Sequence, residues 1–209
     1  MLIDFNTLWP KYNINPKGVL HIGASHGQET AYYVNLGVRD VVYIEALLNV
    51  FEQLVEHVKK FNGKFTCINA CISDVDNEEV IFNVTNNEGQ SSSMLDFGTH
   101  SKQHPTVKVI DTIKLKTTRV DSLYNAYNLS GYDFLNIDLQ CAELLALKSM
   151  GTLLNDFKWI YLEVNRAELY KGCPMYTEVF EYLKQFGFTE TETKWTNHGW
   201  GDSLLTKTI

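Results

Sequence analysis

Residues 19–27 read VLHIGASHG, and residues 41–45 read VVYIE. Each stretch begins with four mostly apolar residues, which is typical of a short buried strand. The first strand runs into a loop that contains two glycines, and the second ends on a carboxylate. Between them, residues 28–36 have the pattern of a helix, and Gly37 follows as its C-cap. This order of strand, helix and strand predicts a parallel sheet with helical crossovers.

The alternation continues along most of the chain. Further strands are expected at residues 64–73, 132–138 and 159–164, and further helices at residues 47–61, 120–127, 143–150 and 175–186. Residues 74–118 depart from this pattern, because they read as antiparallel pieces and a loop, and we interpret them as an insertion or lid. Strands at residues 188–195 and 203–209 flank the loop TNHGWGD and predict a C-terminal β-hairpin.

We therefore expect an α/β fold with a mostly parallel, Rossmann-like sheet whose last hairpin is antiparallel. No Pro/Gly-rich linker divides the chain, so residues 1–209 are expected to form a single domain, which is equally compatible with one module of a longer polypeptide. The formal charge of −7, from 18 basic and 25 acidic residues, argues against nucleic acid as the main partner.

Targeting and redox signals are weak in this sequence. No apolar run approaches the roughly 20 residues of a membrane-spanning helix, and the first 12 residues lack the pattern of a secretory signal. The cysteines form neither a C-x-x-C pair nor a zinc-binding spacing with histidine. We therefore expect reduced thiols and a cytoplasmic location for a chain whose four cysteines are Cys67, Cys71, Cys141 and Cys173.

A ligand site is expected at the carboxyl ends of the parallel strands. The Gly23–Gly27 loop lets backbone approach a ligand, although its G-x-x-x-G spacing matches neither the dinucleotide nor the P-loop pattern. Glu45 follows about 20 residues later, where a carboxylate can accept hydrogen bonds from ribose hydroxyls. The alternatives are a glycine needed only for the turn and a solvated glutamate at a strand end.

The segment DFLNIDLQCAE (residues 133–143) delivers Asp138 to the end of another buried strand. A carboxylate at that place needs a ligand, a metal or a catalytic role to offset its desolvation. Glu143 opens the next helix, where it could serve only to complement the helix dipole. Glu163 ends the neighbouring strand and adds a second carboxylate at the same edge.

Nearly the whole chain resembles the FkbM-type S-adenosylmethionine-dependent methyltransferases, in the segments VLHIGASHGQET, VVYIEA, ACISD, SSSML, VDSLYN, YDFLNIDLQCAELLALKSM, IYLEVN and GDSLLTK. The most specific of these is I-D-x-x-x-x-E. Two positions depart from the family pattern, which usually has an aspartate at His21 and a glycine at Cys141. A glycine position that needs a positive φ would be strained by cysteine.

The resemblance implies a class I methyltransferase fold with a seven-stranded sheet. It also implies that the glycine loop approaches the methionine part of S-adenosylmethionine, that Glu45 binds the ribose, and that Asp138 lies beside the reacting methyl group. The cofactor-binding residues expected on this basis are His21, Gly23, Ala24, Ser25, Gly27, Glu45, Ala46, Cys71, Ile72 and Asp138.

O-methylation needs a base or a Lewis acid, because an aliphatic hydroxyl is a poor nucleophile at neutral pH. Asp138 is the first candidate base, followed by Glu163 and His198. Alternatively, Asp138 and Glu163 could ligate magnesium or manganese, which prefer oxygen ligands. His57, His100 and His104 are interpreted as surface residues.

The family tendency points to a hydroxyl of a sugar or glycan as the acceptor. Aromatic side chains can pack on a pyranose and amides can bond its alcohols, so the expected substrate-binding residues are Asn165, Tyr170, Trp195 and Trp200. The tryptophans could instead close the core under the hairpin. The alternatives to this function are a methyltransferase acting on a non-sugar small molecule and a degenerate binding module, which the departures at His21 and Cys141 favour.

Overall fold

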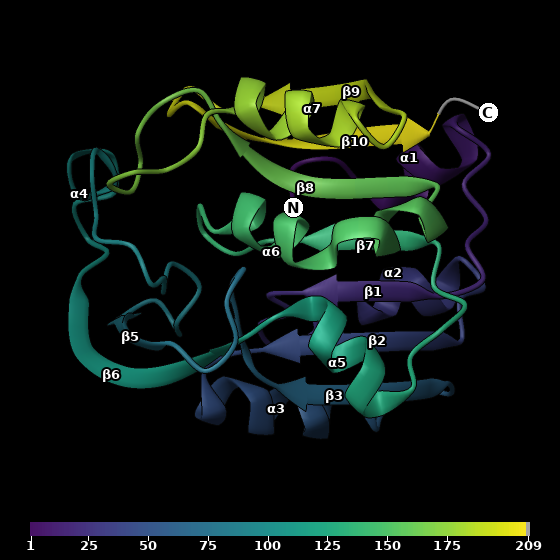
Figure 1. The fold of residues 1–209 in the computed structure, drawn as a ribbon, viewed down its shortest axis with the longest axis horizontal. Coiled ribbons are helices and arrows are strands. Elements are labelled where there is room, and N and C mark those ends of the chain that lie inside the picture. The colour runs from purple at the N-terminus through teal and green to yellow at the C-terminus, as the bar shows by residue number, and fades with distance from the viewer. Residues whose placement is uncertain (208–209) are drawn as a thin grey trace.

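The main sheet has seven strands in the order β3-β2-β1-β7-β8-β10-β9 (Figure 1), in a computed structural model that describes residues 1–207. Parallel pairing joins neighbours among β1 (Val19–Ile22), β2 (Asp40–Glu45), β3 (Lys64–Asn69), β7 (Phe134–Ile137) and β8 (Trp159–Asn165). β10 (Trp200–Lys207) pairs antiparallel with β8 and with β9 (Phe188–Trp195). The expected mostly parallel sheet with a C-terminal antiparallel hairpin is confirmed.

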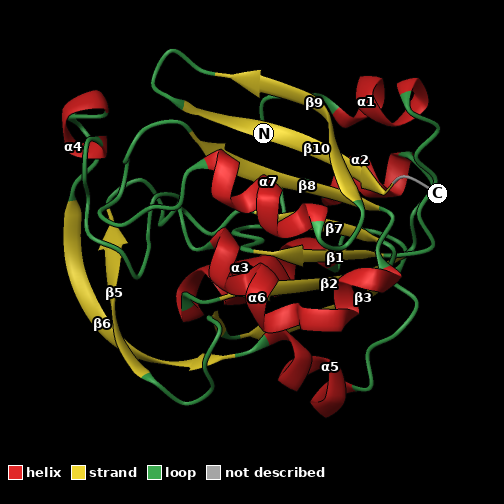
Figure 2. Ribbon diagram, turned by 45° about the horizontal axis from the view of Figure 1, so that its top comes forward, coloured by secondary structure: helices red, strands yellow, loops and turns green. Residues whose placement is uncertain are grey.

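Helices cover both faces of the sheet, as Figures 1 and 2 show. On one face pack α1 (Phe5–Lys11), α2 (Thr30–Asn35) and α3 (Leu48–Val58), and on the other α5 (Val120–Tyr127), α6 (Glu143–Met150) and α7 (Tyr176–Lys184). A 3-10 helix, η1 (Gly151–Asp156), follows α6. Successive strand residues point to opposite faces of the sheet. Val19 and Val41 belong to the hydrophobic cluster under α1, α2 and α3, and Leu20 and Val42 belong to the cluster under α5, α6 and α7. Burial on both faces explains why these strands are apolar throughout.

Residues 71–118 form the insertion, which lies beyond the carboxyl ends of the parallel strands (Figure 1). A second sheet combines β4 (Cys71–Ile72), β6 (Val109–Thr118) and β5 (Glu79–Thr85). Along the chain, the short helix α4 (His100–Gln103) separates β5 from β6. β5 and β6 pair antiparallel, as expected, and form the arm seen in Figure 2.

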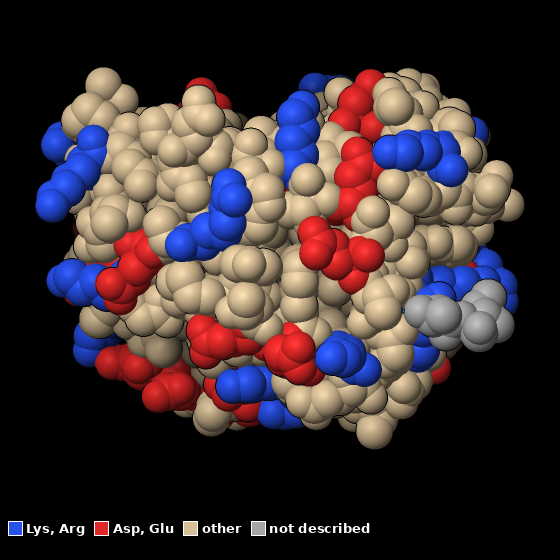
Figure 3. Space-filling view, turned by 90° about the horizontal axis from the view of Figure 1, so that it is seen from above, with Lys and Arg blue, Asp and Glu red and all other residues tan. Residues whose placement is uncertain are grey.

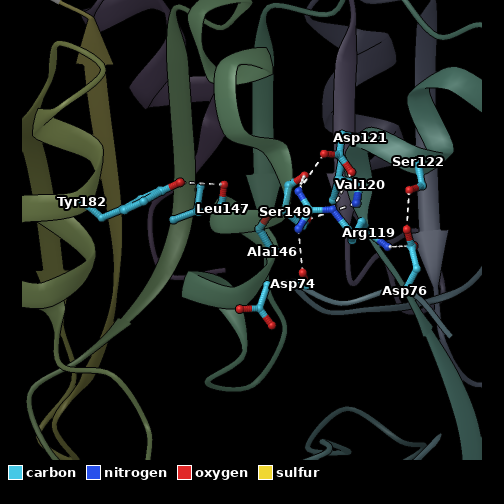
Figure 4. A network of polar contacts seen from close by, with 10 residues as sticks. All are labelled: Asp74, Asp76, Arg119, Val120, Asp121, Ser122, Ala146, Leu147, Ser149 and Tyr182. Atoms are coloured by element: carbon cyan, nitrogen blue, oxygen red, sulfur yellow. Dashed lines mark hydrogen bonds and ion pairs between the residues drawn. The ribbon is translucent and has the colours of Figure 1, made fainter. Parts of the chain in front are cut away.

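Arg119 ties the end of β6 to the main domain (Figure 4). Its guanidinium donates to the Asp121 carboxylate at 2.7 and 2.9 Å, and to the carbonyl oxygens of Asp74 at 2.6 Å and Ser149 at 3.1 Å. The Asp76 carboxylate accepts from the Arg119 backbone N–H at 2.7 Å. Charge-assisted bonds of this kind fix the base of the insertion against α5 and α6.

The prediction of one continuous strand at residues 64–73 is wrong, because this stretch forms two strands, β3 and β4. β3 ends at Asn69, whose side-chain amide donates to the carbonyl oxygens of Glu45 at 2.8 Å and Ala46 at 3.0 Å. After Ala70, Cys71 and Ile72 pair with Thr117 and Thr118 in the second sheet. The strand breaks because its second part pairs with β6 of the insertion, whereas its first part pairs with β2.

The N-terminal segment adds a helix that was not predicted, and the C-terminal hairpin differs in part from the prediction. The N-terminal segment contains α1, which Asp4 caps and whose Phe5, Leu8 and Trp9 are buried despite Pro10 in its last turn. β10 begins at Trp200, so the hairpin loop is shorter than TNHGWGD because Trp200–Asp202 continue the pairing with β8. Residues 208 and 209, the end of the expected last strand, lie outside the described residues.

Cys141 and Cys173 form a disulfide, whereas Cys67 and Cys71 are free. The expectation of four reduced cysteines is therefore wrong for this pair, which no C-x-x-C spacing could reveal because 32 positions separate the two residues. Within residues 1–207, no helix combines the length and hydropathy needed to cross a membrane.

Candidate active site

A cavity of about 440 Å³ lies at the carboxyl ends of β1, β2, β7 and β8. The strand ends and their loops form one wall, and residues 87–94 with His100, His104 and Val107 of the insertion form another. This is where an open parallel sheet is expected to bind its ligand. The insertion thus provides one wall of the site, as a lid would.

The glycine loop forms part of this cavity, and its backbone is held by β2. The N–H groups of Gly23 and Ala24 donate to the Ile44 carbonyl at 2.9 and 3.0 Å. The Glu45 carboxylate accepts from Ser25 N–H and from Leu47 N–H, each at 2.9 Å. Burial raises the pKa of Glu45, and these backbone N–H groups oppose the rise. Glu45 therefore fixes the loop and still borders the cavity.

His21 lies beneath the glycine loop as a neutral side chain. Burial lowers its pKa to about 3, so it carries no charge at neutral pH. Its Nδ1 lies 3.4 Å from the Tyr33 hydroxyl, which in turn accepts from the Asn136 amide at 2.7 Å. A neutral imidazole therefore stands where the family usually has an aspartate.

Asp138 follows β7 and points into the cavity from a tight turn. Its carboxylate accepts from the Gln140 side-chain amide at 2.7 Å. Gln140 has φ 51° and Cys141 φ 79°, so Cys141 stands at a position with a positive φ, which is strained for cysteine. Glu143 opens α6, as expected. It is 2% exposed and accepts from Leu139 N–H at 2.8 Å and Cys141 N–H at 3.2 Å. Burial raises the pKa of Glu143 to about 7.

Carboxylates concentrate where β7, β8 and β10 meet. Glu163 on β8 stands directly opposite Asp202 on β10, and Asp202 accepts from the Tyr161 hydroxyl at 2.6 Å and from Leu2 N–H. Burial first, and then the charges of Asp138, Glu143 and Asp202, raise the pKa of Glu163. Desolvation by the surrounding walls also raises the pKa of Asp138, although its side chain is open to the cavity. Like charges on paired strands destabilise a sheet, so this arrangement calls for a functional reason.

Acidic side chains dominate the charge of the lining, and the N-terminal amino group of Met1 is a positive group among them. Within the described chain, no lysine or arginine lines the cavity, and its acidic residues are Glu29, Glu45, Asp138, Glu163 and Asp202. No group of three or more His, Cys, Asp or Glu side chains in residues 1–207 is arranged to hold a metal ion. Acidic side chains around a cavity attract a positively charged ligand.

Most of the residues expected from the sequence meet at this cavity. It is lined by His21, Gly23, Ala24, Ser25, Glu45, Ala46, Cys71, Ile72, Asp138, Glu163 and Trp200. The others lie around it: Gly27 packs near Leu54, and Tyr170 is buried behind Gln140. Trp195 packs against Tyr176 and under the Arg166 guanidinium, and Asn165 is buried in β8 without lining the cavity. For Trp195 the core-closing alternative describes the packing.

The histidines are placed differently from the expectation. His100 is 4% exposed and lines the cavity together with His104, so the surface interpretation is wrong for His100. Burial lowers the pKa of His100 to about 4. Exposed His198 lies outside the lining, with its ring centroid 4.9 Å from that of His104. No local sequence signal marks His100, because contacts with Tyr170 and Phe97 bury it.

Comparison with known proteins agrees with this geometry. The family model described as the methyltransferase FkbM domain matches residues 21–190. No curated protein sequence matches the chain significantly.

Three solved structures resemble the chain in fold. A magnesium protoporphyrin IX methyltransferase from Synechocystis PCC 6803 with bound S-adenosylmethionine has 9% identity, and the match covers 98% of this chain and 76% of that chain with a TM-score of 0.56. A putative RNA methyltransferase from Pyrococcus horikoshii has 13% identity, and the match covers 98% of this chain and 80% of that chain with a TM-score of 0.54. A ribosomal protein L11 methylase from Lactobacillus delbrueckii subsp. bulgaricus has 11% identity, 98% and 78% coverage and a TM-score of 0.54. At such identities these likenesses concern the fold.

Because the family model spans most of its 209 residues, the chain belongs to the FkbM methyltransferase domain family and has the class I fold of S-adenosylmethionine-dependent methyltransferases.

Proposed function

We propose that this chain is an S-adenosylmethionine-dependent O-methyltransferase whose acceptor is an uncharged hydroxyl compound, namely a sugar or glycan. The observation that carries the proposal is the cavity lining, which has five acidic side chains and, within residues 1–207, no lysine or arginine. S-adenosylmethionine carries a net positive charge because of its sulfonium, whereas a nicotinamide dinucleotide carries a pyrophosphate. The lining therefore suits the first cofactor and repels the second.

The residues of the cavity fit the proposed cofactor. The backbone of Gly23–Ser25 would face the methionine part, Glu45 would accept from the ribose hydroxyls, and Cys71 and Ile72 would border the adenine. A carboxylate that is already held by two backbone N–H groups needs no reorganisation to accept further hydrogen bonds. When bound, S-adenosylmethionine supplies an electrophilic methyl group.

Asp138 is the residue proposed to take the acceptor proton. Its carboxylate lines the cavity and is open to an incoming hydroxyl, which is the position that a general base needs. The insertion wall would exclude water and help to align the acceptor oxygen with the methyl group. Glu163 and His198 remain further candidates for the base. Magnesium or manganese bound by Asp138 and Glu163 would have to take its other ligands from water and the acceptor, as magnesium often does.

The proposed acceptor follows from charge and from side-chain type. Trp200 offers an aromatic face at the cavity, and Asn87, Gln90 and Ser91 offer uncharged polar groups that can bond sugar alcohols. Tyr170, Trp195 and Asn165 stay predictions as acceptor-binding residues. On the face seen in Figure 3, basic and acidic side chains are interspersed, and the net charge of −7 disfavours an RNA acceptor.

Two measurements test the proposed function. Calorimetry should detect binding of S-adenosylmethionine and S-adenosylhomocysteine but not of NAD, and a chain that binds neither methyl cofactor would be the degenerate binding module. Labelled methyl transfer should then be compared across a glycan panel, an RNA panel and small phenols. Transfer to RNA or phenols and to no sugar would overturn the acceptor while keeping the methyltransferase. A cytoplasmic location stays a prediction, for localisation in cells to test.

A further inference from the structure

The Gln140 side chain lies between the candidate base and a buried tyrosine. Its Nε2 is 2.7 Å from Asp138 Oδ1 and 3.5 Å from Glu163 Oε2, and its Oε1 is 2.8 Å from the Tyr170 hydroxyl. Tyr170 is almost fully buried, so it is a fixed partner. One amide group thus joins two carboxylates of the cavity to a rigid residue behind them.

The partners of the amide determine its orientation. An ionised carboxylate only accepts hydrogen bonds, so the group facing Asp138 must be the NH₂ and the group facing Tyr170 must be the carbonyl oxygen. Tyr170 then donates to Gln140, although its hydroxyl also lies 3.0 Å from the Ser91 carbonyl. This orientation directs a donor at Oδ1 of Asp138.

The backbone of Gln140 is held as firmly as its side chain. Its carbonyl accepts from the Ser93 hydroxyl at 2.9 Å, which brings the insertion onto the turn. The next residue, Cys141, is bonded to Cys173, and Glu143 accepts from the N–H of Cys141. A glutamine at φ 51° is sparsely populated, so several contacts together hold a conformation that the residue alone would not prefer.

We propose that Gln140 is a positioning residue, which holds the Asp138 carboxylate in one orientation toward the acceptor and is itself held by Tyr170. The proposal rests on the proposed function, because Asp138 must act on an acceptor for its orientation to matter. It gives Tyr170 a role behind the catalytic turn, as an alternative to the predicted contact with the acceptor. A carboxylate fixed in this way makes its hydrogen bond to the acceptor at a smaller entropic cost.

The test compares Gln140→Leu, Tyr170→Phe and the double variant with wild type. Gln140→Leu should lower kcat about 10- to 100-fold, whereas the KM for the acceptor and the Kd for S-adenosylhomocysteine should stay within about twofold. Tyr170→Phe should lower kcat by a smaller factor. The double variant should be no slower than Gln140→Leu, because residues that act through one contact are not additive. Tyr182→Phe is the matched control, since that hydroxyl meets only the Leu147 carbonyl, at 3.4 Å, among the hydrogen bonds of the described chain.

Three results would overturn the proposal. Unchanged kcat in Gln140→Leu would show that Asp138 needs no such partner. Multiplicative effects of the two substitutions, with a raised KM in Tyr170→Phe, would assign Tyr170 to the acceptor. Parallel losses of kcat, cofactor affinity and thermal stability would make the role merely structural.

Hydrogen exchange separates this proposal from the proposed function. Amides of residues 138–143 should exchange faster in Gln140→Leu than in wild type or Tyr182→Phe, with or without turnover. A wild-type chain that binds S-adenosylmethionine but methylates nothing would overturn the proposed function. Unchanged exchange in Gln140→Leu would overturn the positioning role, whatever the activity.

Discussion

The backbone carbonyl of Asp138 occupies the space that a side chain at Gly23 would need. An ideal Cβ at Gly23 would lie 1.8 Å from that oxygen, and Gly23 has φ +78°. The Asp138 N–H also donates to the Ile22 carbonyl at 3.0 Å. The glycine loop after β1 and the turn after β7 are therefore in direct contact, and the glycine is required by this contact as well as by any ligand.

Gly23→Ala should accordingly damage both loops at once. The new methyl group cannot fit without moving the Asp138 backbone, and positive φ is unfavourable for alanine. We expect a loss of about 3 kcal/mol or more in the free energy of unfolding, together with loss of cofactor binding, measured by urea denaturation and calorimetry. Gly37→Ala is the control, because its φ is also positive but no atom lies within 4 Å of the position that its new Cβ would take. Equal effects of the two variants would contradict the steric explanation.

Glu45→Ala should weaken binding of S-adenosylmethionine and S-adenosylhomocysteine. The substitution removes the proposed ribose acceptor and releases the N–H groups of Ser25 and Leu47. A loss of about 2–3 kcal/mol, or about a hundredfold in Kd, is expected by calorimetry. Glu52→Ala, at an exposed position of α3, should leave both affinities unchanged. Full cofactor affinity in Glu45→Ala would refute the ribose assignment.

Asp138→Asn keeps the size of the side chain and removes its charge. If Asp138 is the base, kcat should fall about 10²- to 10⁴-fold, while the Kd for S-adenosylhomocysteine changes much less. The measurement is steady-state methyl transfer beside calorimetry. Near wild-type turnover would refute both the base and the metal-ligand role. A chelator effect that magnesium or manganese reverses would favour the metal role in wild type.

The sequence predicts the parts of the site that depend on local pattern. Glu45 ends β2, Asp138 directly follows β7, and Glu163 lies two residues before the end of β8. Because the carboxyl ends of parallel strands meet at one edge, their proximity follows from the strand assignments. The position of the glycine loop follows in the same way from the glycines after β1.

The parts that the sequence does not predict depend on distant partners. Ile72 lies outside the main sheet because it pairs with Thr118 in the second sheet. His100 is buried because its backbone N–H donates to the Leu169 carbonyl and its ring packs against Tyr170. Asp202 falls within the expected hairpin loop, whereas pairing with β8 sets it opposite Glu163. No local pattern specifies contacts between segments so far apart.

The disulfide should contribute substantially to stability. Replacing both Cys141 and Cys173 by serine should lower the free energy of unfolding by about 2–4 kcal/mol, because the open chain gains conformational freedom. Cys141→Gly with Cys173→Ser should lose about 1 kcal/mol less, since glycine adopts the positive φ of position 141 at little cost. Urea denaturation with and without a reductant measures both effects. Four free thiols in the denatured, unreduced protein would contradict the pairing.

The last prediction concerns Glu143 and pH. Burial raises the pKa of this carboxyl from the usual 4.5 to about 7 in the folded chain, so between those values the folded state binds more protons than the unfolded state. The stability associated with its protonated form is fully present below pH 4.5 and is lost as the pH rises through about 7. Glu143→Gln is neutral at every pH and therefore provides the reference, which cancels the titration of the groups that the charge of Glu143 does not influence. The free energy of unfolding of wild type, minus that of Glu143→Gln, should fall by an amount on the order of 2 kcal/mol between pH 4.5 and pH 8. Urea denaturation across this range measures the difference. A difference that stays constant, or that rises with pH, would mean that Glu143 is ionised in the folded protein and that the N–H groups of Leu139 and Cys141 outweigh its burial.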